Sequence, residues 1–151
     1  MNAPDDLAPM LNDHRDGWCT AMDLRFVRAT ADEVVAEWRV APQHLQAYGI
    51  VHGGVHAGVI ETLASVGAAL HGMARGQSVV GLENHTSFLR AVREGTLRAT
   101  AKPLTRGRRS QVWEASVVDE AGVLVATGRV RLLCLEEGTQ VAGETVGVKT
   151  T

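Results

Sequence analysis

The chain has 151 residues, 45% of them hydrophobic and 21% charged, with a formal net charge of −2 at pH 7. This length suits a single domain with its own core, and the slightly acidic balance argues against a dedicated nucleic-acid partner. The two cysteines, Cys19 and Cys134, lie in strand-like segments without a C-x-x-C pair, which favours buried, reduced thiols in a reducing cytosol.

The first 16 residues are expected to form a lead-in with a short helix near Asp5 to His14. They contain no apolar signal core, so a cytoplasmic protein without a membrane partner is expected. Two strands are then predicted over 21–29 and 34–40, joined by a turn rich in turn formers. Pro42 ends the second strand.

A helix is predicted from Val55 to about Ala74, because no proline interrupts it and Gly72 and Gly76 supply stop signals. Apolar residues recur at spacings of three and four, and the opposite side is also mostly small. A helix that is apolar almost all round is expected at the centre of a fold.

Further strands are predicted over 78–92, 96–103, 111–118 and from 124 onward, where apolar and polar residues alternate with a period of two. This period marks a half-buried antiparallel sheet. The expected fold class is therefore α+β, with an antiparallel sheet around one long central helix. The predicted domain covers 17–135, between the lead-in 1–16 and a mobile C-terminal tail over 136–151 without a usable pattern.

Glu61 is the only acidic residue on this otherwise apolar or small helix. Ionising a carboxyl in such surroundings costs free energy unless hydrogen bonds or charge partners compensate, so a glutamate at this position requires an explanation. A solvated edge or a pairing with arginine is one explanation. Small neighbours would leave a hollow beside the carboxylate, however, and the Ser65 hydroxyl lies four residues on, at the same face. Glu61 is therefore the candidate catalytic carboxylate, with Ser65 holding a water or the carboxylate itself.

The sequence His52-Gly53-Gly54 precedes the helix, whose first N–H groups have no intrahelical partner. These amides would form an oxyanion hole for a carbonyl that gains charge, although a tight turn into the helix is the simpler alternative. Glu61 lies about seven residues past Gly54, a rise of roughly 10 Å, which is too far for both groups of one subunit to serve one carbonyl. If they act together, the site is shared, and a dimer is predicted.

The remaining polar patterns are less specific. His52 and His56 have a spacing that could bind zinc on a helix, but no H-E-x-x-H motif or nearby cysteine accompanies them, and no metal is predicted. Basic residues dominate 90–109, for which a solvated sheet face is the usual explanation.

Three of these basic residues, Arg106, Arg108 and Arg109, surround Gly107 in a turn suited to phosphate oxygens. Together with Arg90 they are the candidate contacts for the pyrophosphate and 3′-phosphate of coenzyme A. RNA is disfavoured because the chain has few aromatic residues on which bases could stack.

Four segments resemble the hotdog-fold thioesterases of the phenylacetyl-CoA (PaaI-like) and Arthrobacter-type 4-hydroxybenzoyl-CoA group. They are QAYGIVHGG over 46–54, ETLAS over 61–65, NHTSF over 84–88 with Arg90, and the turn before Trp113-Glu114. The resemblance covers about 46–133. It implies a hotdog fold, hydrolysis of an acyl-CoA with an aromatic acyl group favoured weakly, no cofactor, and dimers with shared sites that pair into a tetramer.

The resemblance also implies roles. Glu61 matches the nucleophile or general base, the Gly53 amide matches the group that polarises the thioester carbonyl, and Ser65 matches the hydroxyl that assists. Gln46 and His52 match residues that flank the thioester. A non-catalytic acyl-CoA sensor and a hotdog hydratase or dehydratase are the alternatives. The sequence leaves open the acyl group, coenzyme A against acyl-carrier protein, and the choice between nucleophile and base.

Overall fold

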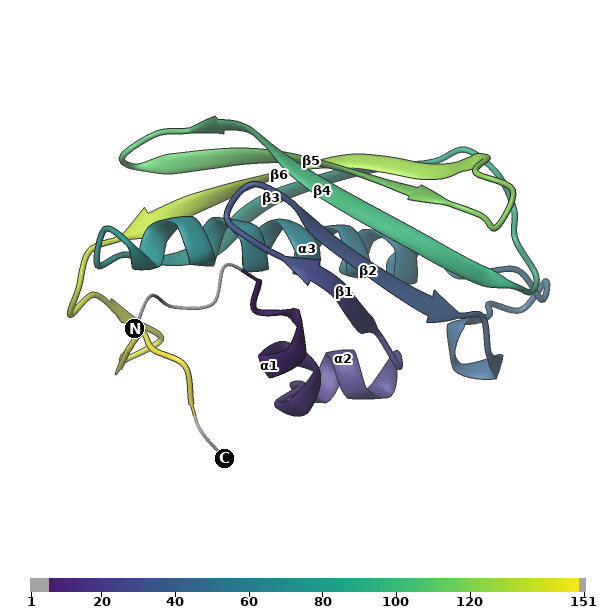
Figure 1. The fold of residues 1–151 in the computed structure, drawn as a ribbon, viewed down its shortest axis with the longest axis horizontal. Coiled ribbons are helices and arrows are strands. Elements are labelled where there is room, and N and C mark those ends of the chain that lie inside the picture. Colours follow the sequence, from purple (N-terminus) through teal and green to yellow (C-terminus); the bar gives the residue numbers. More distant parts are fainter. Residues whose placement is uncertain (1–5, 150–151) are drawn as a thin grey trace.

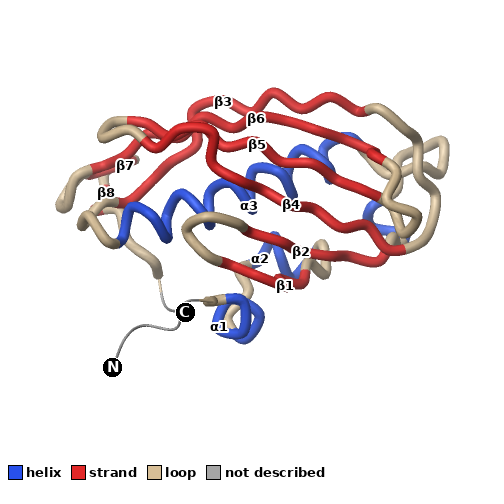
Figure 2. The backbone as a smooth tube through the Cα atoms, turned by 45° about the horizontal axis from the view of Figure 1, so that its top comes forward, coloured by secondary structure: helices blue, strands red, loops and turns tan. Residues whose placement is uncertain are grey.

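The computed structural model describes residues 6–149. One long helix, α3 (Gly53–Met73), lies along a curved antiparallel sheet (Figures 1 and 2). The sheet has the strand order β1-β2-β4-β5-β6-β3. Its strands are β1 (Arg25–Ala29), β2 (Val34–Arg39), β3 (Ser78–Phe88), β4 (Thr96–Arg106), β5 (Ser110–Val118) and β6 (Leu124–Leu135). The predicted α+β architecture is therefore confirmed.

The N-terminal segment agrees with the prediction in part. The short helix α1 (Ala8–Asp13) lies within the predicted range 5–14, of which Asp5 is outside the described residues, and a second short helix, α2 (Gly17–Ala21), was not predicted. The Asp16 carboxylate accepts a hydrogen bond of 2.7 Å from the Cys19 N–H and thereby caps α2. The prediction of a strand from residue 21 is thus wrong at its start, and Cys19 lies in a helix. Both cysteines are buried and free, as expected.

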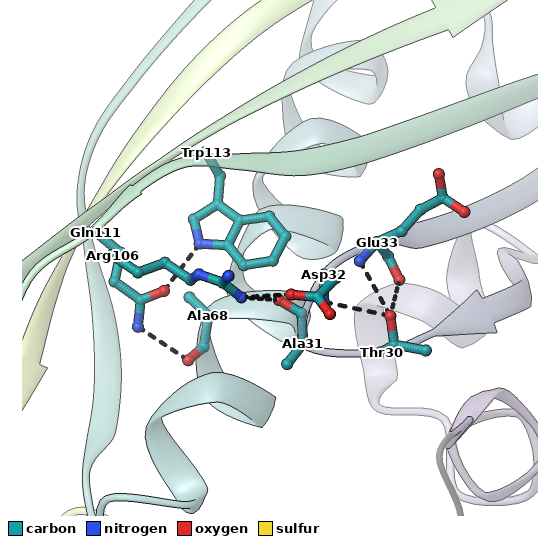
Figure 3. A network of polar contacts seen from close by, with 8 residues as sticks. All are labelled: Thr30, Ala31, Asp32, Glu33, Ala68, Arg106, Gln111 and Trp113. Carbon is teal, nitrogen blue, oxygen red and sulfur yellow. Dashed lines mark hydrogen bonds and ion pairs between the residues drawn. The ribbon is translucent and has the colours of Figure 1, made fainter.

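The helix is held to the sheet by apolar packing and by one buried polar group. A Cβ atom added to Gly67 would lie 2.3 Å from the ring of Trp113, so the glycine lets the indole pack directly on the helix. Gln111 donates a hydrogen bond of 3.1 Å to the Ala68 carbonyl and accepts one of 2.9 Å from Trp113 Nε1 (Figure 3). Because Gln111, Trp113 and Ala68 are all buried, these hydrogen bonds fix the position of α3 along the sheet.

Strand β3 forms one edge of the sheet and pairs only with β6. It ends at Phe88, earlier than predicted, because the N–H groups of Leu89 and Arg90 both turn toward the Val125 carbonyl. Leu82 is 50% exposed and Phe88 is 58% exposed on this strand. An edge with unpaired backbone groups and exposed apolar side chains is suited to pairing with another strand.

The other departures are local. The tail, expected to lack a pattern, contains the hairpin β7 (Gln140–Val141) and β8 (Glu144–Thr145). Strand β4 continues beyond Pro103, where an irregularity in its pairing with β5 accommodates the proline. A 3-10 turn, η1 (Pro42–His44), lies between β2 and α3. By length and composition α3 could also cross a membrane, but the sheet covers much of it.

Candidate active site

Two hollows lie next to each other between the N-terminal half of α3 and the end of β3. The first, called here the glycine hollow, has a volume of about 520 Å³. The second, the carboxylate hollow, has a volume of about 440 Å³ and is lined by Glu61 and Asn84. Gly54 and Phe88 line both. Within one chain, the predicted oxyanion donor and the predicted catalytic carboxylate thus belong to separate hollows.

In the carboxylate hollow, Glu61 lies on the open side of α3 and is exposed in the single chain. Asn84 Nδ2 donates hydrogen bonds to the Ala57 carbonyl (2.9 Å) and to Glu61 Oε2 (3.3 Å). The Thr86 hydroxyl donates to Asn84 Oδ1 at 2.6 Å. A Cβ atom on Gly81 would lie 2.9 Å from Glu61 Oε1, so the missing side chain makes room for the carboxylate. Glu61 is therefore oriented by β3.

This position corrects one expectation about α3. The sheet does not cover the helix on all sides. Glu61 lies on a side that is open to solvent, next to the edge strand β3. No ion pair among residues 6–149 involves Glu61, so a pairing with arginine in the same chain does not explain it. Ser65 is half-buried one turn further along, and it lines neither hollow.

In the glycine hollow, the start of α3 leaves one amide free. The His52 side chain caps the helix, with Nδ1 accepting a hydrogen bond of 2.8 Å from the Gly54 N–H. No hydrogen bond between described residues uses the Gly53 N–H. A Cβ atom on Gly53 would lie 2.7 Å from Phe88 Cζ, so a side chain at this position would require the exposed Phe88 ring to shift. Gly53 thus combines a free donor with an aromatic neighbour.

Gln46 lines the same hollow from the preceding loop. Its side-chain oxygen accepts a hydrogen bond from the Tyr48 N–H, and its backbone N–H donates to the Ile50 carbonyl at 2.9 Å. Arg93 donates to the Tyr48 carbonyl at 2.6 Å and ties this loop to the segment that follows β3. The loop is therefore held in place by its own polar groups.

His56 and His52 do not form a zinc pair, because each ring has a different role. His52 caps the helix, whereas the His56 ring is buried between Trp38 and Phe88, with ring centroids 6.3 Å from each. Burial lowers the pKa of His56 to about 4, so this imidazole is neutral at pH 7. No cluster of three or more potential metal ligands occurs in the described part of the chain.

The basic run does not form one patch. Arg98, Lys102 and Arg106 make ion pairs with acidic residues of β2 and the turn before it, and the Arg106–Asp32 pair is 2.7 Å long (Figure 3). Arg108 and Arg109 are exposed in the β4–β5 turn, which lies beside the start of β3. Arg90 follows the end of β3 and lines the glycine hollow. Within one chain, the length of β3 therefore separates Arg90 from this turn.

Sequence reasoning did not assign three residues that the structure brings to the site. Asn84 and Phe88 lie in a segment noted for its resemblance to thioesterases, and alternation along β3 could have pointed to both. His56 was considered only as a metal ligand. Its position one helical turn after Gly53 was the available signal.

A curved antiparallel sheet around one helix, with a carboxylate and a free helix-start amide beside an edge strand, defines a hotdog-type hydrolase site. Residues 48–126 match the model of the thioesterase superfamily. The chain belongs to this superfamily and is a hotdog-fold thioesterase.

Similar proteins include protein Rv1847 of Mycobacterium tuberculosis strain H37Rv, 42% identical over 117 residues, 76% of this chain and 84% of the relative. The 1,4-dihydroxy-2-naphthoyl-CoA hydrolase of Escherichia coli K12 is 36% identical over 109 residues, 72% of this chain and 79% of the relative. Among solved structures, thioesterase HI1161 of Haemophilus influenzae is 28% identical with a TM-score of 0.80, covering 85% of this chain and 90% of that one.

Proposed function

We propose that this protein hydrolyses an aromatic acyl-CoA to the free acid and coenzyme A at sites shared between two subunits. The observation that carries the proposal is the separation of the two hollows along one face of α3. The rise of the helix between Gly53 and Glu61 places these two groups of one chain too far apart to act on one carbonyl, yet both hollows adjoin the same free edge strand.

Antiparallel pairing of β3 with the β3 strand of a second subunit, about a twofold axis, would allow Gly53 of one subunit and Glu61 of the other to act on one carbonyl. Such pairing is self-complementary, as a closed dimer requires. It would bring the partner's Glu61, which lies beside the middle of β3, toward Gly53, which lies beside the end of this strand. It would also bring the partner's Arg108 turn, beside the start of β3, toward the end that carries Arg90. The exposed Leu82 and Phe88 would be covered.

In the proposed mechanism, the thioester oxygen accepts a hydrogen bond from the Gly53 N–H, where the positive end of the helix stabilises developing charge. Glu61 either attacks the carbonyl carbon, with coenzyme A leaving as the thiolate and water then hydrolysing the resulting anhydride, or removes a proton from a water that attacks this carbon and displaces the same thiolate. The Asn84 amide orients the carboxylate, Gln46 and His52 flank the thioester, and Ser65 lies one helical turn after Glu61. Single turnover in ¹⁸O-labelled water tests the nucleophilic route, because label enters the Glu61 carboxylate only when water opens an anhydride at the carbonyl carbon of Glu61.

Two variants test the chemistry with coenzyme A release as the readout. Glu61→Gln keeps the shape of the side chain and is expected to lower kcat by about 10²–10⁴-fold. Gly53→Pro removes the N–H at the first helical position, where proline is well tolerated and His52 already has the extended backbone that precedes proline. Its Cβ atom also requires the exposed Phe88 ring to shift. A loss of about 10²–10³-fold is expected. Gly53→Ala is the matched control, since it adds a carbon near Phe88 and keeps the N–H.

Mixed dimers of the two inactive variants test the shared site. A Glu61→Gln chain paired with a Gly53→Pro chain contains one site with both groups intact if the site crosses the interface. Coexpression at equal levels should then restore about a quarter of the wild-type rate, because about half of the dimers are mixed and each has one working site. Unchanged activity in Glu61→Gln would refute the catalytic role, and the absence of any restoration would refute the shared site.

A further inference from the structure

His56 lies deeper in the glycine hollow than the amide at which the thioester is proposed to bind. It follows Gly53 by one helical turn, a rise of about 4.5 Å, and points to the same side of α3. Its side chain is 3% exposed and lines the hollow together with Gly53 and Phe88. A group bound at Gly53 and extending inward would therefore reach the imidazole within a few bonds.

The surroundings of this imidazole contain unused hydrogen-bonding atoms. His56 Nδ1 is buried and has no partner among the described residues, and the same is true of the nearby Trp38 Nε1. Most buried polar atoms in proteins have a partner, because burying one without any is costly. Two aromatic rings, those of Trp38 and Phe88, flank the imidazole. Of the polar residues that line the hollow, His56 is the only buried one, and Gln46, His52 and Arg90 are more exposed.

We propose that His56 is a specificity-determining residue, whose imidazole forms a hydrogen bond with an oxygen substituent on the acyl group. The inference rests on the proposed function, since it needs the thioester carbonyl at Gly53. A neutral imidazole can donate from one nitrogen and accept at the other, so it can pair with a hydroxyl group. The short distance from Gly53 favours aromatic acyl groups hydroxylated at ring positions 2 or 3, near the carbonyl, over position 4.

The competing explanation is a purely structural imidazole, satisfied by a buried water between Trp38 and His56. In that case the side chain would affect every substrate in the same way, because it would act only through packing at the start of α3. The ratio of kcat/KM between hydroxylated and unsubstituted esters therefore separates the two roles, whereas the absolute rate does not.

The experiment compares benzoyl-CoA with its 2-, 3- and 4-hydroxy derivatives in the wild type, His56→Phe and His56→Asn. The phenyl ring keeps the aromatic packing and removes both nitrogens, and the asparagine amide keeps a hydrogen-bonding atom near the position of Nδ1. The wild type should prefer a 2- or 3-hydroxy ester over benzoyl-CoA, and His56→Phe should reduce that ratio by about tenfold. His56→Asn should retain part of the preference.

Several results would overturn the inference. They are a wild type without preference, a ratio unchanged in His56→Phe, or a uniform loss for all esters together with a lower Tm. A preference for the 4-hydroxy ester alone would refute the assigned position. Failure of the proposed function looks different, because the wild type would then release no coenzyme A from any ester and Glu61→Gln would have no effect.

Discussion

Lowering the pH should destabilise the fold through His56. Burial lowers the pKa of this histidine to about 4, from an ordinary value of 6.5, and no charged group contributes to the shift. Between these two pKa values the unfolded chain binds a proton that the folded chain does not. The free energy of unfolding is therefore at its full value above pH 6.5 and falls as the pH drops from 6.5 toward 4.

The size of the effect follows from the shift. At about 1.4 kcal/mol per pKa unit, the full loss is roughly 3 kcal/mol, of which about 2 kcal/mol is reached at pH 5. Such a loss is a substantial part of the stability of an ordinary domain.

Urea unfolding of the wild type and His56→Phe at pH 8, 6.5 and 5 measures this contribution, at one protein concentration because the proposed dimer is concentration-dependent. His71, whose pKa is also lowered by burial, is present in both proteins and cancels in the difference. The difference in unfolding free energy between the two proteins should change by about 2 kcal/mol between pH 8 and pH 5. Parallel pH profiles would refute the assignment of this proton to His56.

Three further predictions concern packing, affinity and assembly. Gly67→Ala should lower the free energy of unfolding by about 1–3 kcal/mol in denaturant titrations, because the added carbon meets a buried indole ring at 2.3 Å; an unchanged midpoint would contradict the packing described. Arg108→Ala should raise KM about tenfold with little change in kcat, whereas Arg98→Ala, whose guanidinium already pairs with a carboxylate, should not; equal effects would exclude the turn as a phosphate contact. Leu82→Glu should produce monomers in sedimentation experiments and abolish activity, whereas Leu104→Glu, at a similarly exposed residue of β4, should do neither; a stable Leu82→Glu dimer would rule out pairing through β3.

The fold was predictable from the sequence wherever apolar residues recur at a regular spacing. The long helix and the alternating strands β4 to β6 were found close to their true bounds, because burial of one face imposes a strict spacing. The helix α2 was not predicted, because it has only five residues and depends on a single cap from Asp16. The β7–β8 hairpin was missed for a similar reason, since its strands have two residues each and bury none of them.

The site was predictable only in part. Glu61 stood out because a carboxylate is unusual on an apolar helix, and Gly53 because it lies at the start of that helix. The distance between them followed from helix geometry alone. The split of the basic run could not be seen, because it depends on which acidic residues lie across the sheet. Arg98 pairs with Glu37 and Lys102 with Glu33, residues about 60 to 70 positions earlier in the chain. Periodicity contains no information about such partners.

The least predictable feature is the irregularity in β3. Strict alternation would place Gly81 and Asn84 on opposite faces of the strand, because they are three residues apart. The pairing with β6 shifts between Gly81 and Glu83, so Leu82 is an extra residue. The shift brings both Gly81 and Asn84 to the face that meets α3. There the glycine leaves space for the Glu61 carboxylate and the amide donates to it. The same extra residue is the exposed Leu82, so one irregularity both orients the proposed catalytic group and provides an apolar side chain for the proposed interface.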